Sequence, residues 1–397
     1  MTRTPTTAIA GIGRTPYFKR GASVPRTKLQ MACQAIKAAC EDAGISVKDI
    51  DGFAYYSGGF DTARIAQMLG IPEVTFTASL TGGGGGASAA VGLGAMAIDA
   101  GQATHVVSLM TLQQTPDARL GAAFATKGKS AYSAPSESHV DFVAPSGLFS
   151  PGQMMSVLAM RHMHLYGTRR EAFAEIAISQ RENAIKRPTS RFTEPITLED
   201  YFNARMISDP LCLFDYTQEN DGAVAVITTS AERARDLRKP PAYVLASAHG
   251  GKGRWGLAYQ QMQMPDEYFT SSGHRPVAKR LYEQAGITPA DVDVALLYDH
   301  FSPMVLMQIE DYGFCEIGEG GAFVEAGNIR YGTGTIPVNT HGGNLSEAYI
   351  IGMTHVYEAV EQVRGEAVNQ VEDAEIALAT GGPASIPTSG LLLGRSA

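Results

Sequence analysis

The feature that most constrains the fold is a weak internal repeat. Residues 38–57 read AACEDAGISVKDIDGFAYYS, and residues 280–299 read RLYEQAGITPADVDVALLYD, at a constant offset of 242 residues. Seven positions are identical, which in the first copy are Glu41, Ala43, Gly44, Ile45, Asp49, Asp51 and Tyr56. Each copy predicts a helix ended by glycine, a short loop and a buried strand. This helix–loop–strand pattern is common in α/β proteins, but seven identities at one constant offset favour an internal duplication of the chain.

A second echo follows in each half. Ala95–Met110 and Val356–Thr380 both predict a helix, a glycine turn and an apolar strand. We therefore expect two α/β halves, residues 1–238 and 239–397. Residues from about 113 to 209 do not continue the pattern and are interpreted as an insertion that covers a site, with a helix over Gly152–Asn183.

Composition excludes several classes of function. The chain has 397 residues and a net charge of −8, and nucleic-acid binding needs a Lys/Arg excess. No run reaches the roughly 18 apolar residues that span a bilayer, and Met1–Arg14 does not resemble a signal peptide. The four cysteines form no CxxC pair, so we expect a cytoplasmic protein without a disulfide framework. Low charge with 43 glycines indicates closely packed backbones and an oligomer.

A glycine-rich turn at Thr81–Ser88 stands between an apolar segment and a predicted helix. Backbone N–H groups at such a turn can bind an anion. The turn does not match G-x-G-x-x-G, because Ala87 stands where the last glycine belongs, and no acidic residue stands at a convincing strand end about twenty residues further on. Nucleotide binding of the Rossmann type is therefore not expected. The alternatives are close helix packing and the approach of a ligand to the backbone.

Two further segments carry polar groups suited to chemistry. Tyr298–Ser302 (YDHFS) ends the strand of the second repeat copy, where Tyr, Asp and His are placed for acid/base work. Asn339–Gly352 (NTHGGNLSEAYIIG) has paired glycines and then a polar cluster. The groups singled out there are His341, Asn344, Ser346, Glu347 and Tyr349. No metal-spaced His/Cys set and no GxSxG motif occurs, so no metal site is expected.

Taken together, these segments resemble the thiolase superfamily, and within it the lipid-transfer-protein-type thiolase-like branch. The similar pieces are AGIGRTPY, GAMAIDAGQA, DGAVAVITT, GFCEIGEGGAFV, NTHGGNLSEAYIIG and ATGGPASIPTSG. They cover the chain nearly end to end. The resemblance implies an α/β thiolase fold of two duplicated βαβαβαββ halves in an αβαβα layered sandwich, with an inserted loop domain.

The chain departs from the thiolase pattern at each catalytic position. The nucleophilic cysteine of the family falls at about Gly84, and the histidine of its Gly-His-Pro motif falls on Tyr349. The histidine of the family's His-Asp-Cys-Phe motif falls on Tyr298, and the second cysteine falls at about Thr380. The thiolase route through an acyl-enzyme is therefore not expected.

Loss of the cysteines and gain of two tyrosines resembles the steroid side-chain-cleaving aldolases of the same branch. The resemblance implies retro-aldol cleavage of a β-hydroxyacyl-CoA to a ketone and a short acyl-CoA, without a bound cofactor. It also implies a homodimer and a small OB-fold/zinc-ribbon partner protein. Tyr298 and Tyr349 are the predicted acid/base pair, and the sequence does not assign which of them is the acid and which is the base. The supporting catalytic residues are Asp299, His300 and His341, and the predicted substrate-binding residues are Gly83, Gly84, Gly85, Asn344, Ser346 and Gly381.

Two alternatives stay open. An acyltransferase with another nucleophile would become acylated by acyl-CoA. A non-catalytic acyl-CoA-binding subunit of an OB-fold complex would bind CoA esters without turnover. The acyl chain itself is not identified by the residues.

Overall fold

Two groups of strands with the same internal order build the central sheet. The computed structural model describes residues 4–56, 61–80, 84–114, 144–148, 150–251, 269–384 and 387–397. The first group has the order β4-β3-β5-β8-β1 and the second has the order β10-β11-β12-β9. The pairs β3–β5 and β10–β11 are parallel, and the pairs that follow them in each group are antiparallel. The predicted duplication is confirmed.

The elements have the following bounds. The strands are β1 Thr7–Arg14, β2 Phe18–Lys19, β3 Gly52–Tyr56, β4 Phe76–Leu80, β5 Val106–Leu112, β6 Met206–Ser208, β7 Leu211–Cys212, β8 Asn220–Ser230, β9 Ala242–Gly250, β10 Val294–Leu296, β11 Ile376–Gly381 and β12 Thr388–Gly394. The α-helices are α1 Lys28–Ala43, α2 Thr62–Leu69, α3 Gly86–Asp99, α6 Pro151–Tyr166, α7 Arg170–Ala184, α8 Leu198–Asn203, α9 Ala231–Arg235, α11 Arg275–Ala285, α12 Ser302–Asp311, α13 Gly320–Glu325, α14 Gly343–Ser346 and α15 Met353–Arg364. The proposed boundary at residues 238 and 239 falls between α9 and β9.

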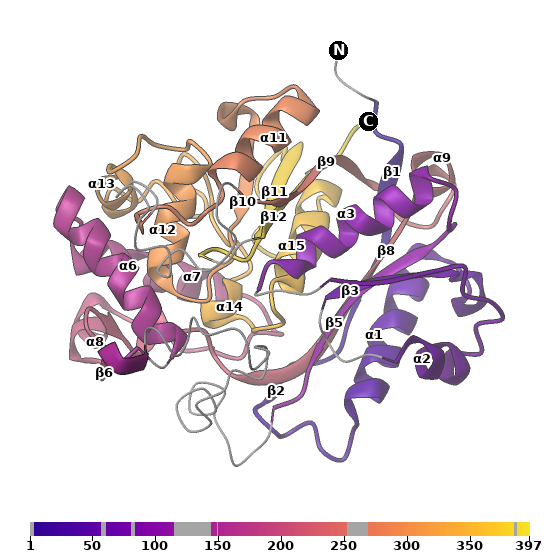
Figure 1. Ribbon diagram of the computed structural model, residues 1–397, viewed down its shortest axis with the longest axis horizontal. Coiled ribbons are helices and arrows are strands. Elements are labelled where there is room, and N and C mark those ends of the chain that lie inside the picture. Colours follow the sequence, from indigo (N-terminus) through magenta and orange to yellow (C-terminus); the bar gives the residue numbers. More distant parts are fainter. Residues whose placement is uncertain are drawn as a thin grey trace.

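The layers alternate as the thiolase fold requires. Helix α3 contacts β3, β5 and β8 of the first half and also β9, β11 and β12 of the second, and α15 likewise contacts both groups. Helix α1 covers the outer face of the first group and α11 covers that of the second. Figure 1 shows α3 and α15 side by side at the centre of the molecule. The many Gly and Ala residues of α3 let it pack closely against both sheets.

The repeated residues do the same structural work in each half. Helices α1 and α11 both end at a left-handed glycine, Gly44 (φ +76°) and Gly286 (φ +69°). Asp51 accepts hydrogen bonds from the N–H groups of Thr104 and His105 at 2.9 and 2.8 Å. Asp293, its counterpart, accepts from the N–H groups of residues 375 and 376 at 2.8 Å each. Each aspartate thus fastens its strand to the start of the next parallel strand.

The insertion contains α6, α7, α8 and β6, which pairs with β7 just beyond it. The single helix expected over Gly152–Asn183 is wrong in one respect, because Gly167 adopts φ +71° and ends α6 before α7 begins. Helix α7 packs against α12, α13 and α14 of the second half. The insertion therefore rests beside the segment that carries Tyr349. Within the described part of the chain, no helix is long and apolar enough to cross a bilayer.

Candidate active site

The hydroxyls of Tyr298 and Tyr349 meet. Tyr298 follows β10 and Tyr349 follows α14, and the Tyr298 Oη donates a hydrogen bond to the Tyr349 Oη at 3.4 Å. Tyr298 is buried, with 1% of its surface exposed, and Tyr349 is half-buried. Burial, followed by the nearby Tyr349 phenol, raises the pKa of Tyr298 well above 10. Tyr298 is therefore protonated at neutral pH and acts as a donor.

The backbone of Tyr298 is held by buried side chains. Its N–H donates to the Thr380 Oγ1 at 2.8 Å, and its carbonyl accepts from the Gln308 Nε2 at 2.8 Å. The Thr380 hydroxyl donates in turn to the Gln308 Oε1 at 2.6 Å. Thr380 stands where the resemblance places a second cysteine, and in this chain it anchors the strand end that bears Tyr298.

Gly84 leaves the space that the Tyr298 hydroxyl occupies. A Cβ atom at Gly84 would lie 2.5 Å from the Tyr298 Oη and 2.8 Å from its Cζ, closer than any stable contact. A Cβ at Gly381 would lie 3.4 Å from the Gly84 carbonyl oxygen, and the Ser389 hydroxyl donates to the Gly85 carbonyl. Gly84, Gly85, Gly381 and the phenol thus converge at the N-terminus of α3. Gly83 lies outside the described residues.

Asp299 connects the two tyrosine-bearing segments. Its carboxylate accepts hydrogen bonds from the N–H groups of Asn344 and Leu345 in α14, at 2.9 and 3.0 Å. The Gln180 amide, oriented with its nitrogen toward Asp299, donates to Oδ2 at 2.6 Å. The His355 Nε2 donates to Oδ1 at 2.9 Å. The carboxylate is therefore fully buried yet surrounded by donors, which compensates the cost of burying it.

Of the two predicted histidines, His300 packs against Tyr298 and His341 packs against His355. The His300 ring packs edge-on against the Tyr298 ring, with centroids 5.3 Å apart, and burial lowers the pKa of His300 to about 3. The His341 ring packs edge-on against the His355 ring at 4.8 Å, and burial lowers the pKa of His341 well below 6.5. The His300 Nδ1 and both ring nitrogens of His341 are buried without a partner in the described parts of the chain. At neutral pH both rings are uncharged.

Asn344 and Ser346 differ in what their side chains contact. The Ser346 Oγ accepts a hydrogen bond from the Arg181 Nε of α7 at 3.0 Å. The Asn344 carbonyl accepts from the Thr217 hydroxyl at 3.0 Å, but both polar atoms of its side-chain amide are buried and unpaired among the described residues. Asn344 therefore keeps hydrogen-bonding capacity for a ligand or water, whereas Ser346 fastens the insertion to α14.

Four residues at this site were not singled out from the sequence. Besides His355 and Gln180, they are Asn220, whose Oδ1 accepts from the Tyr349 N–H at 2.6 Å, and Tyr56, whose ring lies 2.0 Å from the position of a Cβ at Gly86. Tyr56 had a signal, because it is the repeat counterpart of Tyr298. The other three come from α15, α7 and β8 and carry no motif.

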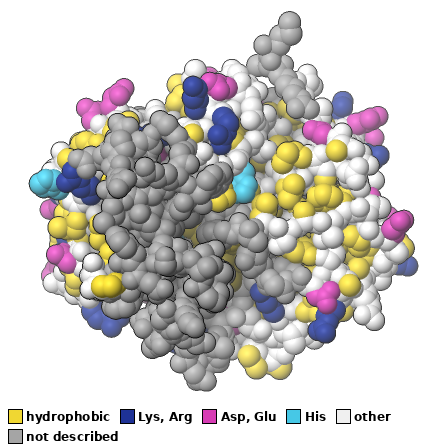
Figure 2. All heavy atoms as spheres, viewed as in Figure 1, with side chains coloured by type: hydrophobic (Ala, Val, Ile, Leu, Met, Phe, Trp, Pro, Cys, Tyr) yellow, Lys and Arg dark blue, Asp and Glu magenta, His cyan; other side chains and the backbone are white. Residues whose placement is uncertain are grey.

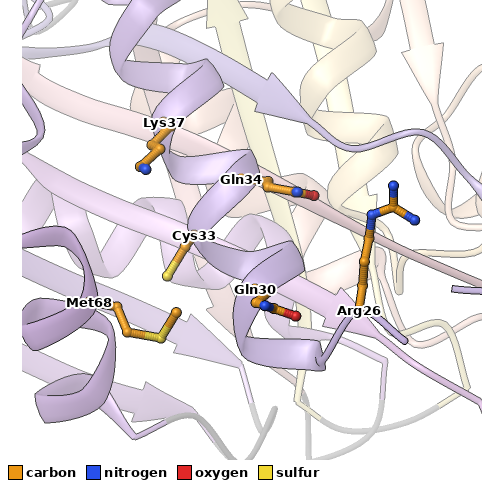
Figure 3. Close-up of a pocket in the computed structure, with 6 residues that line it drawn as sticks. All are labelled: Arg26, Gln30, Cys33, Gln34, Lys37 and Met68. Carbon is orange, nitrogen blue, oxygen red and sulfur yellow. The ribbon is translucent and has the colours of Figure 1, made fainter. Parts of the chain in front are cut away.

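No group of His, Cys, Asp and Glu residues suited to a metal ion occurs within the described residues. A separate surface pocket of about 230 Å³ lies between α1 and α2 (Figure 3). Its lining residues are Arg26, Gln30, Cys33, Gln34, Lys37 and Met68. None of them belongs to the predicted site.

The chain is similar in sequence and in structure to known proteins of the thiolase type. Residues 7–209 match the family model described as "Thiolase, N-terminal domain", and residues 256–392 match "Thiolase C-terminal domain-like". The chain is 40% identical to a steroid side-chain-cleaving aldolase of Thermomonospora curvata, covering 98% of this chain and 97% of the relative. It is 39% identical to a 17-hydroxy-3-oxo-4-pregnene-20-carboxyl-CoA lyase of Mycobacterium tuberculosis, covering 98% of each. A solved structure described as "Ltp2-ChsH2(DUF35) aldolase" matches with a TM-score of 0.90 and 38% identity over 99% of each chain.

Proposed function

The chain belongs to the thiolase superfamily, and we propose that it is a carbon–carbon lyase that splits a β-hydroxyacyl-CoA into a ketone and a shorter acyl-CoA. Two relatives near 40% identity are named as an aldolase and a lyase, and the second acts on a steroid acyl-CoA. We take the same substrate class, a steroid with a CoA-linked side chain, for this chain. The observation that carries the proposal is the tyrosine pair, with hydroxyls 3.4 Å apart beside a glycine where a thiolase needs its nucleophile.

The reaction needs a base and an acid but no covalent intermediate. The base takes the proton of the β-hydroxyl, the Cα–Cβ bond breaks, the oxygen becomes the ketone, and the electron pair moves into the thioester as an enolate. The acid then protonates Cα. We assign Tyr298 as the acid, because burial keeps it protonated and it donates to Tyr349. Tyr349 is assigned as the base, since its hydroxyl accepts that hydrogen bond and it is the half-buried member of the pair.

The enolate oxygen needs donors as charge develops. Gly85 precedes α3 without a side-chain cap, so backbone N–H groups at Gly84–Gly86 are suited to stabilise this oxygen. Asn344, whose buried side-chain amide has no partner among the described residues, is suited to hydrogen-bond the substrate.

The acyltransferase alternative lacks an activated thiol. Burial raises the pKa of Cys40 and Cys315 to about 12, that of Cys212 to about 11, and that of Cys33 above 9. A thiolate is the reactive form of cysteine, so these groups are poor nucleophiles at neutral pH.

We further propose a cytoplasmic homodimer that works with a small OB-fold/zinc-ribbon partner. Strand β4 ends the sheet with Phe76, Ala78 and Leu80 only half-buried, and an unprotected edge of this kind favours pairing with a second copy. Met96 of α3 is 59% exposed, and apolar side chains gather in Figure 2 where Figure 1 places α3. The solved relative described with ChsH2(DUF35) supports a partner protein.

The test is mass spectrometry of products after the chain, with its partner protein, is incubated with a steroid β-hydroxyacyl-CoA. We expect a ketone and a short acyl-CoA without added free CoA. Tyr298→Phe and Tyr349→Phe are each expected to lower kcat/KM by about 10²–10⁴-fold. Tyr312→Phe is the matched control, since Tyr312 is as deeply buried but hydrogen-bonds His274 in the second-half core. Cleavage that requires free CoA, or tyrosine variants within a few fold of wild type, would count against the proposal.

A further inference from the structure

We propose that His355 is a positioning residue that holds the Tyr298 phenol in its reactive geometry, an inference that rests on the proposed function. His355 lies on α15 with none of its surface exposed. Neither the internal repeat nor the polar segments pointed to it. It therefore adds a residue to the candidate site.

His355 contacts the Tyr298 ring and the residue on each side of it in the chain. Its ring stacks on the phenol ring with centroids 6.0 Å apart and planes 22° apart. Its Nε2 faces the Leu297 carbonyl at 3.1 Å and the Asp299 Oδ1 at 2.9 Å, which belong to the residues directly before and after Tyr298. One imidazole thus contacts both chain neighbours of Tyr298 through its Nε2 and packs against the Tyr298 ring. Side chains locked in this way keep a reactive group within the narrow range of geometry that catalysis needs.

The start of α15 is shaped to the same phenol. Gly352 precedes the helix with φ +80°, and a Cβ there would lie 2.8 Å from the Tyr298 Cδ2. His355 follows three residues later, so one helical turn supplies both the space for the ring and the group that covers it.

The contact also reaches Tyr349. Asp299 receives the His355 N–H on one carboxylate oxygen, and the carboxylate also receives the N–H groups of Asn344 and Leu345. Tyr349 follows these residues after one short turn. Loss of the imidazole N–H leaves Asp299 with fewer hydrogen-bond donors. It thereby weakens the connection between the segments that carry Tyr298 and Tyr349, whose hydroxyls lie 3.4 Å apart.

Two substitutions separate the two contacts. His355→Phe keeps a ring against Tyr298 but loses the N–H, and His355→Gln keeps an N–H but loses the ring. We expect each to lower kcat by about 10–100-fold with KM within a few fold, the range seen when a supporting hydrogen bond or geometry is lost. The matched controls are His162→Phe and His162→Gln. His162 is also fully buried and bonds the carboxylate of Glu310 at 3.1 Å, but its ring packs against Tyr166.

A second readout is independent of turnover. In protein labelled with 3-fluorotyrosine, the ¹⁹F resonance of Tyr298 is identified by its loss in Tyr298→Phe. It is expected to shift in both His355 variants and to stay in place in both His162 variants. An unmoved resonance in the His355 variants, or an equal fall of kcat in the His162 controls, would overturn the positioning role. If the wild-type chain cleaves no β-hydroxyacyl-CoA, the proposed function fails, and the resonance still decides whether His355 positions Tyr298.

Discussion

Replacing Gly84 with alanine tests the link between the missing nucleophile and the tyrosine pair. The new Cβ would lie 2.5 Å from the Tyr298 Oη, 2.8 Å from its Cζ and 3.3 Å from its Cε1. Since unstrained contacts need about 3.5 Å, the phenol must retreat by roughly 1 Å. Gly352 and the His355 ring already pack against the same phenol ring, which restricts its freedom to move. We expect a cost of about 1–3 kcal/mol in the free energy of unfolding, as for other overpacked sites.

The catalytic loss should exceed what this destabilisation implies. A shift of roughly 1 Å separates the hydroxyls and costs about 10²-fold in kcat. Gly92→Ala is the matched control, because Gly92 lies within α3, six residues after its first residue Gly86, and its Cβ would meet the Ser247 Oγ of β9 at 2.7 Å. Steady-state cleavage and thermal unfolding of both variants give the comparison. A folded Gly84→Ala variant with kcat within threefold of wild type would refute the reasoning, and so would an equal loss in Gly92→Ala.

Two predictions concern pH and stability. Burial lowers the pKa of His274 to about 3. Between about pH 6.5 and 3 the histidine therefore binds a proton in the unfolded chain but not in the folded one. As pH falls through that window, the free energy of unfolding decreases by about 1.4 kcal/mol per pH unit. Urea unfolding at pH 7.5 and 5.0 should therefore show a smaller pH effect in His274→Gln, and an unchanged effect contradicts it. Burial and the neighbouring Glu358 raise the pKa of Glu361 to about 7, so the folded chain holds its proton more tightly and stability is lost as pH rises from about 4.5 to 7. In the same assay, the free energy of unfolding of Glu361→Gln minus that of wild type should therefore be larger at pH 8 than at pH 5. A smaller difference at pH 8 would show that the ion pair with Arg187 dominates.

The fold was predictable because the repeat keeps residues that fix the backbone, either by ending a helix or by hydrogen-bonding a neighbouring strand. Gly44 and Gly286 end helices, and Asp51 and Asp293 fasten neighbouring strands, so the same phrase specifies the same geometry in each half. The break between α6 and α7 was not predicted. A single glycine within a helical pattern is compatible both with a continuous helix and with a left-handed end, and only packing decides between them.

The site was predictable only where its residues share a segment. Tyr298, Asp299 and His300 are neighbours in the chain, and Tyr349 stands in a glycine-rich polar motif. His355, Gln180 and Asn220 reach the same centre from separate elements, so their proximity is a product of tertiary packing. Tyr56 was within reach of the sequence, since the repeat pairs it with Tyr298.

The scaffold alternative explains these contacts less well than catalysis does. Gly84 and Tyr298 form one matched pair, since a cysteine at Gly84 could not coexist with the phenol in its present place. A chain relieved of catalysis has no need to bury the Asn344 amide and the His341 imidazole, which find no partner in the described parts of the chain. Each unsatisfied polar group of this kind costs about 1–3 kcal/mol, and apolar side chains would remove the cost. Retaining such groups in the segment that carries Tyr349 makes sense where a polar substrate completes their hydrogen bonds, which is what an aldolase site requires.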